Sequence, residues 1–145
     1  MVNAYPFFAY SANSDTISLD YALFRNNSGV VDSGNGLRYH SLLEAQLDAV
    51  FTAMSALNYN DVKMVVTETG WPSMGDENEI GAGEENAASY NGNLVRRVLT
   101  RGGTPLRPQH PPERLPIRSV QREQETGAHI RAELRVILPE RAKGV

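Results

Sequence analysis

The chain has 145 residues, a net charge of −3 and no cysteine. This length suits one modest hydrophobic core, the charge gives no sign of a nucleic-acid-binding surface, and no apolar run is long enough to cross a membrane. The lack of cysteine excludes a disulfide scaffold and a thiolate metal site. We predict no metal and no cofactor, and no signal peptide is visible at the amino terminus.

The first expected elements are short. Residues 2–8 predict a strand, whose pairing Pro6 limits at one end. A polar, turn-rich stretch follows over residues 11–16, and residues 17–24 are expected to be extended. Residues 32–36 have the Gly, Asn and Asp content of a turn.

A helix is predicted to begin after Ser41. Ser41 is a good N-cap, and Glu44 follows three residues later, as in a capping box. Apolar residues then recur at helical spacing, and we expect them to pack in the core: Leu43, Leu47, Val50, Phe51, Met54 and Leu57. Residues 58–61 turn the chain toward the next strand. His40 stands alone before the helix, where a surface position or packing at the helix start is expected.

The next strand ends in a carboxylate. Residues 62–68 are rich in β-branched side chains and end at Glu68, after which Gly70, Trp71 and Pro72 stop the strand. Active sites of α/β enzymes lie at the carboxyl ends of their strands, and a large aromatic beside a carboxylate is common in sugar-binding sites. The alternative is a surface glutamate at a strand end. Residues 84–101 predict a further helix, and the alternation of strands and helices predicts a parallel sheet.

The loop after Trp71 is acidic. It contributes to a cluster of five carboxylates: Asp76, Glu77, Glu79, Glu84 and Glu85. Carboxylates are calcium ligands, but their spacing here fits no calcium-binding loop. A solvated loop is therefore preferred over a metal site.

Several segments resemble sequence motifs of one protein family and occur in the same order as in that family. Residues 2–10, VNAYPFFAY, resemble the VNxYPYFAY segment of plant β-1,3-glucanases, glycoside hydrolase family 17. Residues 66–73, VTETGWPS, resemble its VSETGWPS signature, which is the most specific of these motifs. Residues 19–24 (LDYALF), 86–91 (NAASYN) and 103–108 (GTPLRP) also resemble family segments.

The resemblance implies an α/β fold, a partial (β/α)₈ TIM barrel formed by strands six and seven with their helices. A whole barrel takes about 250 residues, so residues 1–108 are expected to be the carboxyl-terminal part of one. The implied activity is hydrolysis of internal β-1,3-glucosidic bonds in glucans, with retention and without a cofactor. The expected partner is β-1,3-glucan, and the expected state is a monomer that is secreted to the extracellular space, cell wall or vacuole. The sequon Asn26-Asn27-Ser28 agrees with secretion.

The resemblance also implies the site. Retaining glycosidases use two carboxylates about 5–5.5 Å apart, and Glu68 matches the family's nucleophile. Tyr5 matches a residue of the sugar cleft, Phe8 and Trp71 offer apolar faces to sugar rings, and Asn3 supplies a hydrogen bond. Core packing is the alternative for each aromatic. The family's proton donor lies in a Gly-Asn-Glu motif, which this sequence lacks, so the alternative function is an inactive truncated fragment or a glucan-binding remnant.

Residues 109–145 differ from the rest. They are rich in Arg, Glu, Gln and Pro and match no segment of the family. A polar helix over residues 119–137 and a disordered tail are two interpretations. We prefer a shifted reading frame. Codons can be chosen for residues 117–124 that encode FALFNEN when they are read one base further on, and this segment resembles the family's last strand.

Overall fold

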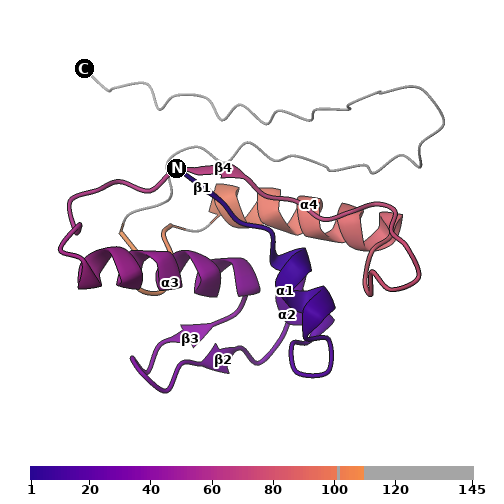
Figure 1. Ribbon diagram of the computed structural model, residues 1–145, viewed down its shortest axis with the longest axis horizontal. Coiled ribbons are helices and arrows are strands. Elements are labelled where there is room, and N and C mark those ends of the chain that lie inside the picture. The colour runs from indigo at the N-terminus through magenta and orange to yellow at the C-terminus, as the bar shows by residue number, and fades with distance from the viewer. Residues whose placement is uncertain (101, 110–145) are drawn as a thin grey trace.

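The computed structural model describes residues 1–100 and 102–109. Figure 1 shows the arrangement, in which α3 and α4 lie on the same side of the paired strands β1 and β4. The elements in chain order are β1 (Val2–Asn3), α1 (Pro6–Ala12), α2 (Leu19–Ala22), β2 (Val30–Val31), β3 (Arg38–Tyr39), α3 (Leu42–Ala56), β4 (Val66–Glu68) and α4 (Glu84–Thr100). Of the tail predicted over residues 109–145, only Gln109 is among the described residues. Across this described part, no helix combines the length and apolar character that a membrane crossing requires.

The parallel sheet is confirmed, but its strands are shorter than predicted. β1 pairs with β4 in parallel, with Val2 opposite Val66 and Asn3 opposite Glu68. The strand predicted over residues 2–8 is wrong beyond Asn3, because Pro6 begins α1 instead of ending a strand. Proline is favoured at the first helical position, where its missing N–H costs no intrahelical hydrogen bond.

The extended conformation predicted for residues 17–24 is also wrong. This segment contains the single helical turn α2 (Leu19–Ala22). The Ser18 hydroxyl caps it by accepting a hydrogen bond from the backbone N–H of Tyr21 at 3.2 Å. Serine satisfies an otherwise unpaired helical N–H in this way, which favours a helical turn over an extended segment here.

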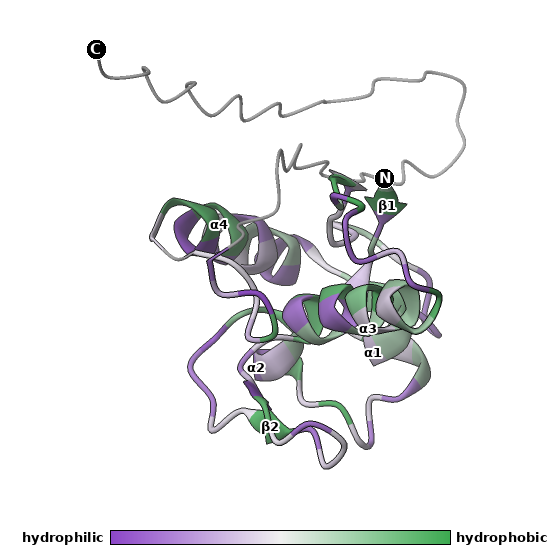
Figure 2. Ribbon diagram, turned by 90° about the vertical axis from the view of Figure 1, so that its left-hand side faces the viewer, coloured by the Kyte–Doolittle hydropathy of each residue, from purple (hydrophilic) through white to green (hydrophobic). Residues whose placement is uncertain are grey.

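The turn predicted over residues 32–36 is confirmed, and it belongs to an unpredicted hairpin. β2 and β3 pair in antiparallel fashion on either side of the turn. The side chains of Asp32 and Asn35 hold the turn by accepting bonds from the backbone N–H groups of Gly34 and Leu37, each at 2.8 Å. In Figures 1 and 2 the hairpin lies on the opposite side of α3 from β1 and β4. Figure 2 shows β2 as a hydrophobic strand, and its two valines are exposed.

The helix predicted after Ser41 is confirmed with its cap. The Ser41 hydroxyl accepts a bond from the Glu44 N–H at 3.3 Å, and α3 follows. Leu43, Leu47 and Phe51 are buried as predicted. Leu57 is 67% exposed, so the core position predicted for it is wrong, because the helix ends one residue before it.

The segment after α4 folds back onto α3. Asp48 is a buried carboxylate of α3, and its Oδ2 accepts a bond from the backbone N–H of Leu106 at 2.8 Å. The Arg107 guanidinium lies over the Phe51 ring, 4.2 Å from its centroid, which is a favourable cation–π distance. Residues 102–109 therefore belong to the folded unit.

Buried tyrosines predict a loss of stability in alkali. Burial, with the nearby Glu44 charge as a further cause, raises the pKa of Tyr21 to about 12, and burial also raises the pKa of Tyr39. From about pH 10 upward the unfolded chain releases phenolic protons that the folded chain retains, so the unfolding free energy falls by up to about 1.4 kcal/mol per pH unit for each such tyrosine. Urea unfolding at pH 9 and pH 11 should show this loss. Tyr21→Phe should make this pH-dependent loss of unfolding free energy smaller. Tyr59→Phe, at an exposed position, should leave the loss unchanged. An equal loss in both variants would contradict the explanation.

Candidate active site

The carboxylate of Glu68 lies at the carboxyl end of β4, as predicted. Tyr5 follows β1, and its hydroxyl donates a hydrogen bond to Oε2 of Glu68 at 2.7 Å. The backbone N–H of Ala4 donates to the carbonyl oxygen of Glu68 at 2.9 Å. Two neighbouring parallel strands thus bring a phenol and a carboxylate together across 63 residues of sequence.

An irregularity in strand pairing positions Glu68. Val2 pairs with Val66 and Asn3 with Glu68, so Thr67 is an extra residue in β4. The Thr67 hydroxyl donates to Oδ1 of Asn3 at 2.6 Å and lies 3.2 Å from the carbonyl oxygen of Val2. Bulges of this kind re-aim side chains beside active sites. The Asn3 amide thus holds Thr67, a residue that the sequence analysis did not single out.

A small, mainly apolar cavity adjoins Tyr5. Its volume is about 240 Å³, and its lining residues are Tyr5, Phe7, Phe8, Gly70, Trp71, Pro72 and Glu79. The Phe8 side chain is 62% exposed, and its ring stands edge-on to the Tyr5 ring with the centroids 6.0 Å apart. An exposed aromatic surface therefore lies next to the residue that binds the carboxylate.

The Trp71 side chain is buried, as in the core-packing alternative. Its side chain is 0% exposed, so the indole has no free face for a sugar ring. The ring packs against Phe7, Tyr10 and Tyr90, with centroid distances of 5.2, 5.7 and 5.6 Å. Its Nε1–H donates to the carbonyl oxygen of Gly81 at 2.8 Å. Trp71 is a core residue that fixes the loop after β4.

A buried pair of hydroxyls holds the residue after Glu68. Thr69 and Tyr90 are both 0% exposed, and their side-chain oxygens are hydrogen-bonded to each other. Burial raises the pKa of Tyr90, so the phenol stays protonated. This bond ties the residue that follows β4 to α4.

The geometry agrees with comparisons to known proteins. The family model described as "Glycosyl hydrolases family 17" matches residues 1–115. The chain belongs to glycosyl hydrolases family 17. Glucan endo-1,3-beta-glucosidase 14 of Arabidopsis thaliana is 49% identical over 111 residues, which are 77% of this chain and 28% of that protein. Glucan endo-1,3-beta-D-glucosidase of Olea europaea is 45% identical over 108 residues, covering 74% of this chain and 24% of that protein.

A solved family 17 structure shows the same fold. CJP38, a β-1,3-glucanase and allergen of Cryptomeria japonica pollen, superposes with a TM-score of 0.68 at 45% identity, over 77% of this chain and 33% of that one. The described residues therefore form part of a β-glucanase fold. The chain spans about a quarter of the length of the curated relatives that it matches.

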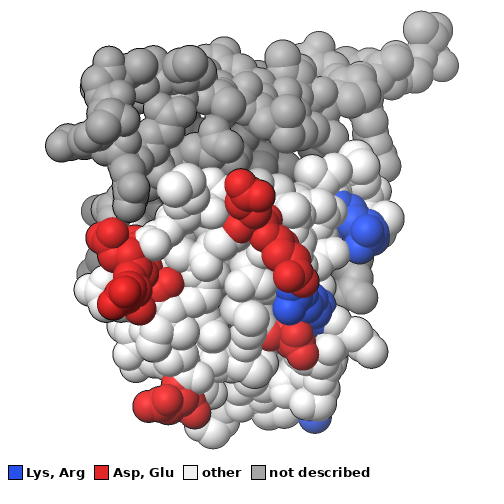
Figure 3. Space-filling view, turned by 90° about the vertical axis from the view of Figure 1, so that its right-hand side faces the viewer, with Lys and Arg blue, Asp and Glu red and all other residues white. Residues whose placement is uncertain are grey.

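The acidic loop of this family 17 chain is exposed, as predicted. Asp76, Glu77, Glu84 and Glu85 are all exposed, and the Glu79 carboxylate accepts a bond from the Asp76 N–H at 3.1 Å. Figure 3 shows acidic side chains in separate groups on the face that carries the β4–α4 loop, with few basic ones. In the described part of the chain, no three His, Asp or Glu side chains are placed to hold a metal ion.

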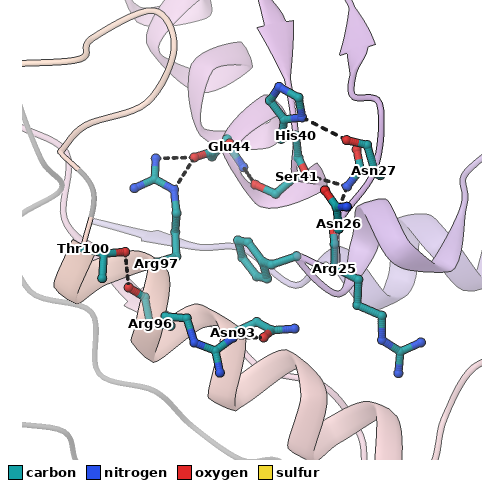
Figure 4. A pocket seen from close by; sticks show the side chains of 11 residues that line it. Arg25, Asn26, Asn27, His40, Ser41, Glu44, Asn93, Arg96, Arg97 and Thr100 are labelled. Atoms are coloured by element: carbon teal, nitrogen blue, oxygen red, sulfur yellow. Dashed lines mark hydrogen bonds and ion pairs between the residues drawn. The ribbon is translucent and has the colours of Figure 1, made fainter.

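A second, polar cavity lies between the start of α3 and the carboxyl-terminal half of α4 (Figure 4). Its volume is about 410 Å³, and none of the predicted site residues lines it. Glu44 and Arg97 form an ion pair in its wall, with Nε of Arg97 2.6 Å from Oε1 of Glu44. His40 is exposed, as predicted, and its Nδ1 lies 3.3 Å from the carbonyl oxygen of Asn27.

Proposed function

We propose that this chain supplies the nucleophile of a retaining endohydrolase that cleaves internal β-1,3-glucosidic bonds in glucans. The observation that carries the proposal is the hydrogen bond between the Tyr5 hydroxyl and the Glu68 carboxylate at the ends of two parallel strands. The names of the relatives, glucan endo-1,3-beta-glucosidases, support β-1,3-glucan as the substrate. A retaining reaction needs a carboxylate nucleophile and a second carboxylic acid about 5–5.5 Å away.

The Glu68 carboxylate would attack the anomeric carbon and form a glycosyl ester, while the second acid protonates the departing oxygen. Water would then cleave the ester, with the same acid acting as a base. Tyr5 restricts the rotamers of Glu68 by binding Oε2, and so holds the nucleophile ready for attack. The exposed Phe8 ring, beside the apolar cavity, provides a surface for the apolar face of a neighbouring glucose unit.

The finer assignments are part of the same proposal. β1 and β4 would be strands six and seven of a (β/α)₈ barrel, because the family motifs occur in that order. The protein would act as a monomer in the extracellular space, cell wall or vacuole, in keeping with a polysaccharide substrate.

A non-catalytic glucan-binding role is the second candidate. It is favoured by the exposed Phe8 ring beside Tyr5. In that case the 145-residue chain would bind β-1,3-glucan and release no reducing sugar.

The deciding experiment tests the nucleophile without a proton donor. A 2-deoxy-2-fluoro β-glucoside with a dinitrophenolate leaving group needs no acid, because the leaving group departs as a stable anion. We expect the chain to release dinitrophenolate and to carry one fluoroglucosyl group on the peptide that contains Glu68, as measured by mass spectrometry. Glu68→Gln should carry none. Absence of the label from folded wild-type chain would exclude Glu68 as a nucleophile and leave glucan binding as the function.

Tyr5→Phe should slow this labelling without unfolding the chain. The substitution removes only the hydroxyl that donates to Glu68, and a hydrogen bond to a charged group is worth about 1.5–3 kcal/mol, which corresponds to roughly a 10–100-fold slower rate. Tyr59→Phe is the matched control, because Tyr59 is exposed. An unchanged labelling rate in Tyr5→Phe would show that the hydroxyl does not position the nucleophile.

A further inference from the structure

The segment between α2 and β2 contains the only Asn-X-Ser/Thr triplet of the chain, Asn26-Asn27-Ser28. Such a triplet is the acceptor for N-linked glycosylation when its middle residue is not proline. Because the glycan is bulky and hydrophilic, the folded protein must hold the modified asparagine at its surface. A folded protein retains the glycan without strain only where the surroundings have room for it.

The side chains of Asn26 and Asn27 differ in their hydrogen bonds. The Asn27 side chain is fully used: Nδ2 donates to the carbonyl oxygens of Arg25 and His40 at 2.8 and 3.0 Å, and Oδ1 accepts from the Gly29 N–H at 2.8 Å. Asn26 is exposed. Among the described residues its side-chain amide has no hydrogen-bond partner. The amide nitrogen that would receive a sugar is therefore the one that the fold does not use.

The rest of the loop fixes the triplet at the surface. Ser28 is exposed, and its carbonyl oxygen accepts a bond from Arg38 Nη1 at 2.8 Å. Gly29 has a φ of +75°, a conformation that glycine adopts at no steric cost, and it turns the chain into β2. The backbone is thus held from both sides while the side chains of Asn26 and Ser28 face water.

The surroundings of Asn26 suit a glycan. Asn26 lines the polar cavity in Figure 4, which has a volume of about 410 Å³ and also includes Asn93 and Arg96 in its lining. The neighbouring β2–β3 hairpin lies across α3 from β1 and β4 (Figures 1 and 2), so a sugar chain here would leave Glu68 open. From these observations we propose that Asn26 is an N-glycosylation site that carries one oligosaccharide.

The test expresses the full 145-residue chain behind a cleavable secretory leader in yeast or plant cells. Total cell lysate and medium are both analysed, because glycans are added during synthesis and a retained chain still carries them. We expect a single upward mass shift that peptide-N-glycosidase F removes, with conversion of Asn26 to aspartate in the tryptic peptide. The leader makes the result independent of the proposed localisation and of catalysis.

Three variants separate the triplet from the fold. Asn26→Gln and Ser28→Ala each destroy the triplet, and both should abolish the shift. Asn27→Gln disturbs the hydrogen bonds of the loop but leaves a valid triplet, so it should keep the shift. The proposal is overturned if the wild-type chain stays unglycosylated while a control glycoprotein in the same cells is modified, or if the shift persists in Asn26→Gln.

Discussion

Replacement of Arg97 by methionine is expected to lower the unfolding free energy by about 3–5 kcal/mol. The guanidinium and the Glu44 carboxylate are ion-paired, with side-chain exposures of only 17% and 10%. Arg97 also donates to the carbonyl oxygens of Gly102 and Gly103 at 3.2 and 3.0 Å. The substitution therefore leaves a carboxylate with little access to water and without its cation, and it frees two carbonyl groups.

The neighbouring arginine provides a matched control. The Arg96 guanidinium donates to the Asn93 side chain at 2.8 Å in an exposed position, so Arg96→Met should cost less than about 0.5 kcal/mol. Urea unfolding of both variants gives the comparison. A double-mutant cycle with Glu44→Gln isolates the pair, since the second substitution should cost less when Arg97 is already absent. Equal losses from Arg96→Met and Arg97→Met would show that the pair contributes nothing specific.

The pair joins segments that lie far apart in the chain. It connects the first turn of α3 to the end of α4, and the Asp48 carboxylate one turn further along α3 holds Leu106. Two acidic side chains of one helix thus fix the segment that follows α4. The apolar spacing of α3 predicts its buried face, but it carries no information about which cation will lie beside Glu44.

The sequence predicts best where local chemistry and tertiary packing agree. Ser41 and the apolar positions after it define a helix by capping and by periodicity, and the structure has that helix. Glu68 is placed at a strand end because β-branched residues precede it and Gly70 follows. These signals lie within a few residues of the feature that they predict.

Prediction fails where one residue type serves two purposes. Pro6 limits a strand or begins a helix, and the choice depends on how Phe7 and Tyr10 pack against the core. The bulge at Thr67 is invisible in the sequence, because it exists only in the register between β1 and β4. The hydrogen bond between Tyr5 and Glu68 likewise depends on that pairing.

The same ambiguity affects the aromatics of the site, and it leads to a second expected result. Trp71→Ala should cost about 3–5 kcal/mol of unfolding free energy, because it opens a cavity among three aromatic rings. It also removes the hydrogen bond to Gly81, although the Asn86 side chain still donates to that carbonyl oxygen at 3.0 Å. Phe8→Ala should change the unfolding free energy by less than about 0.5 kcal/mol, because the ring is mostly in water.

Substitutions at Phe8 and Trp71 should differ in their effect on glucan binding, measured by affinity electrophoresis in gels that contain a soluble β-1,3-glucan. Phe8→Ala should weaken retardation in the gel while the chain remains folded. Trp71→Phe preserves most of the packing and is used because Trp71→Ala can prevent folding. It should leave retardation unchanged, because the indole has no exposed face. If Trp71→Phe instead abolishes binding at unchanged stability, the indole must become exposed when glucan binds, and its assignment to the core would be wrong. The comparison therefore tests whether an aromatic beside the proposed nucleophile, Glu68, contacts the sugar directly or supports the loop that does.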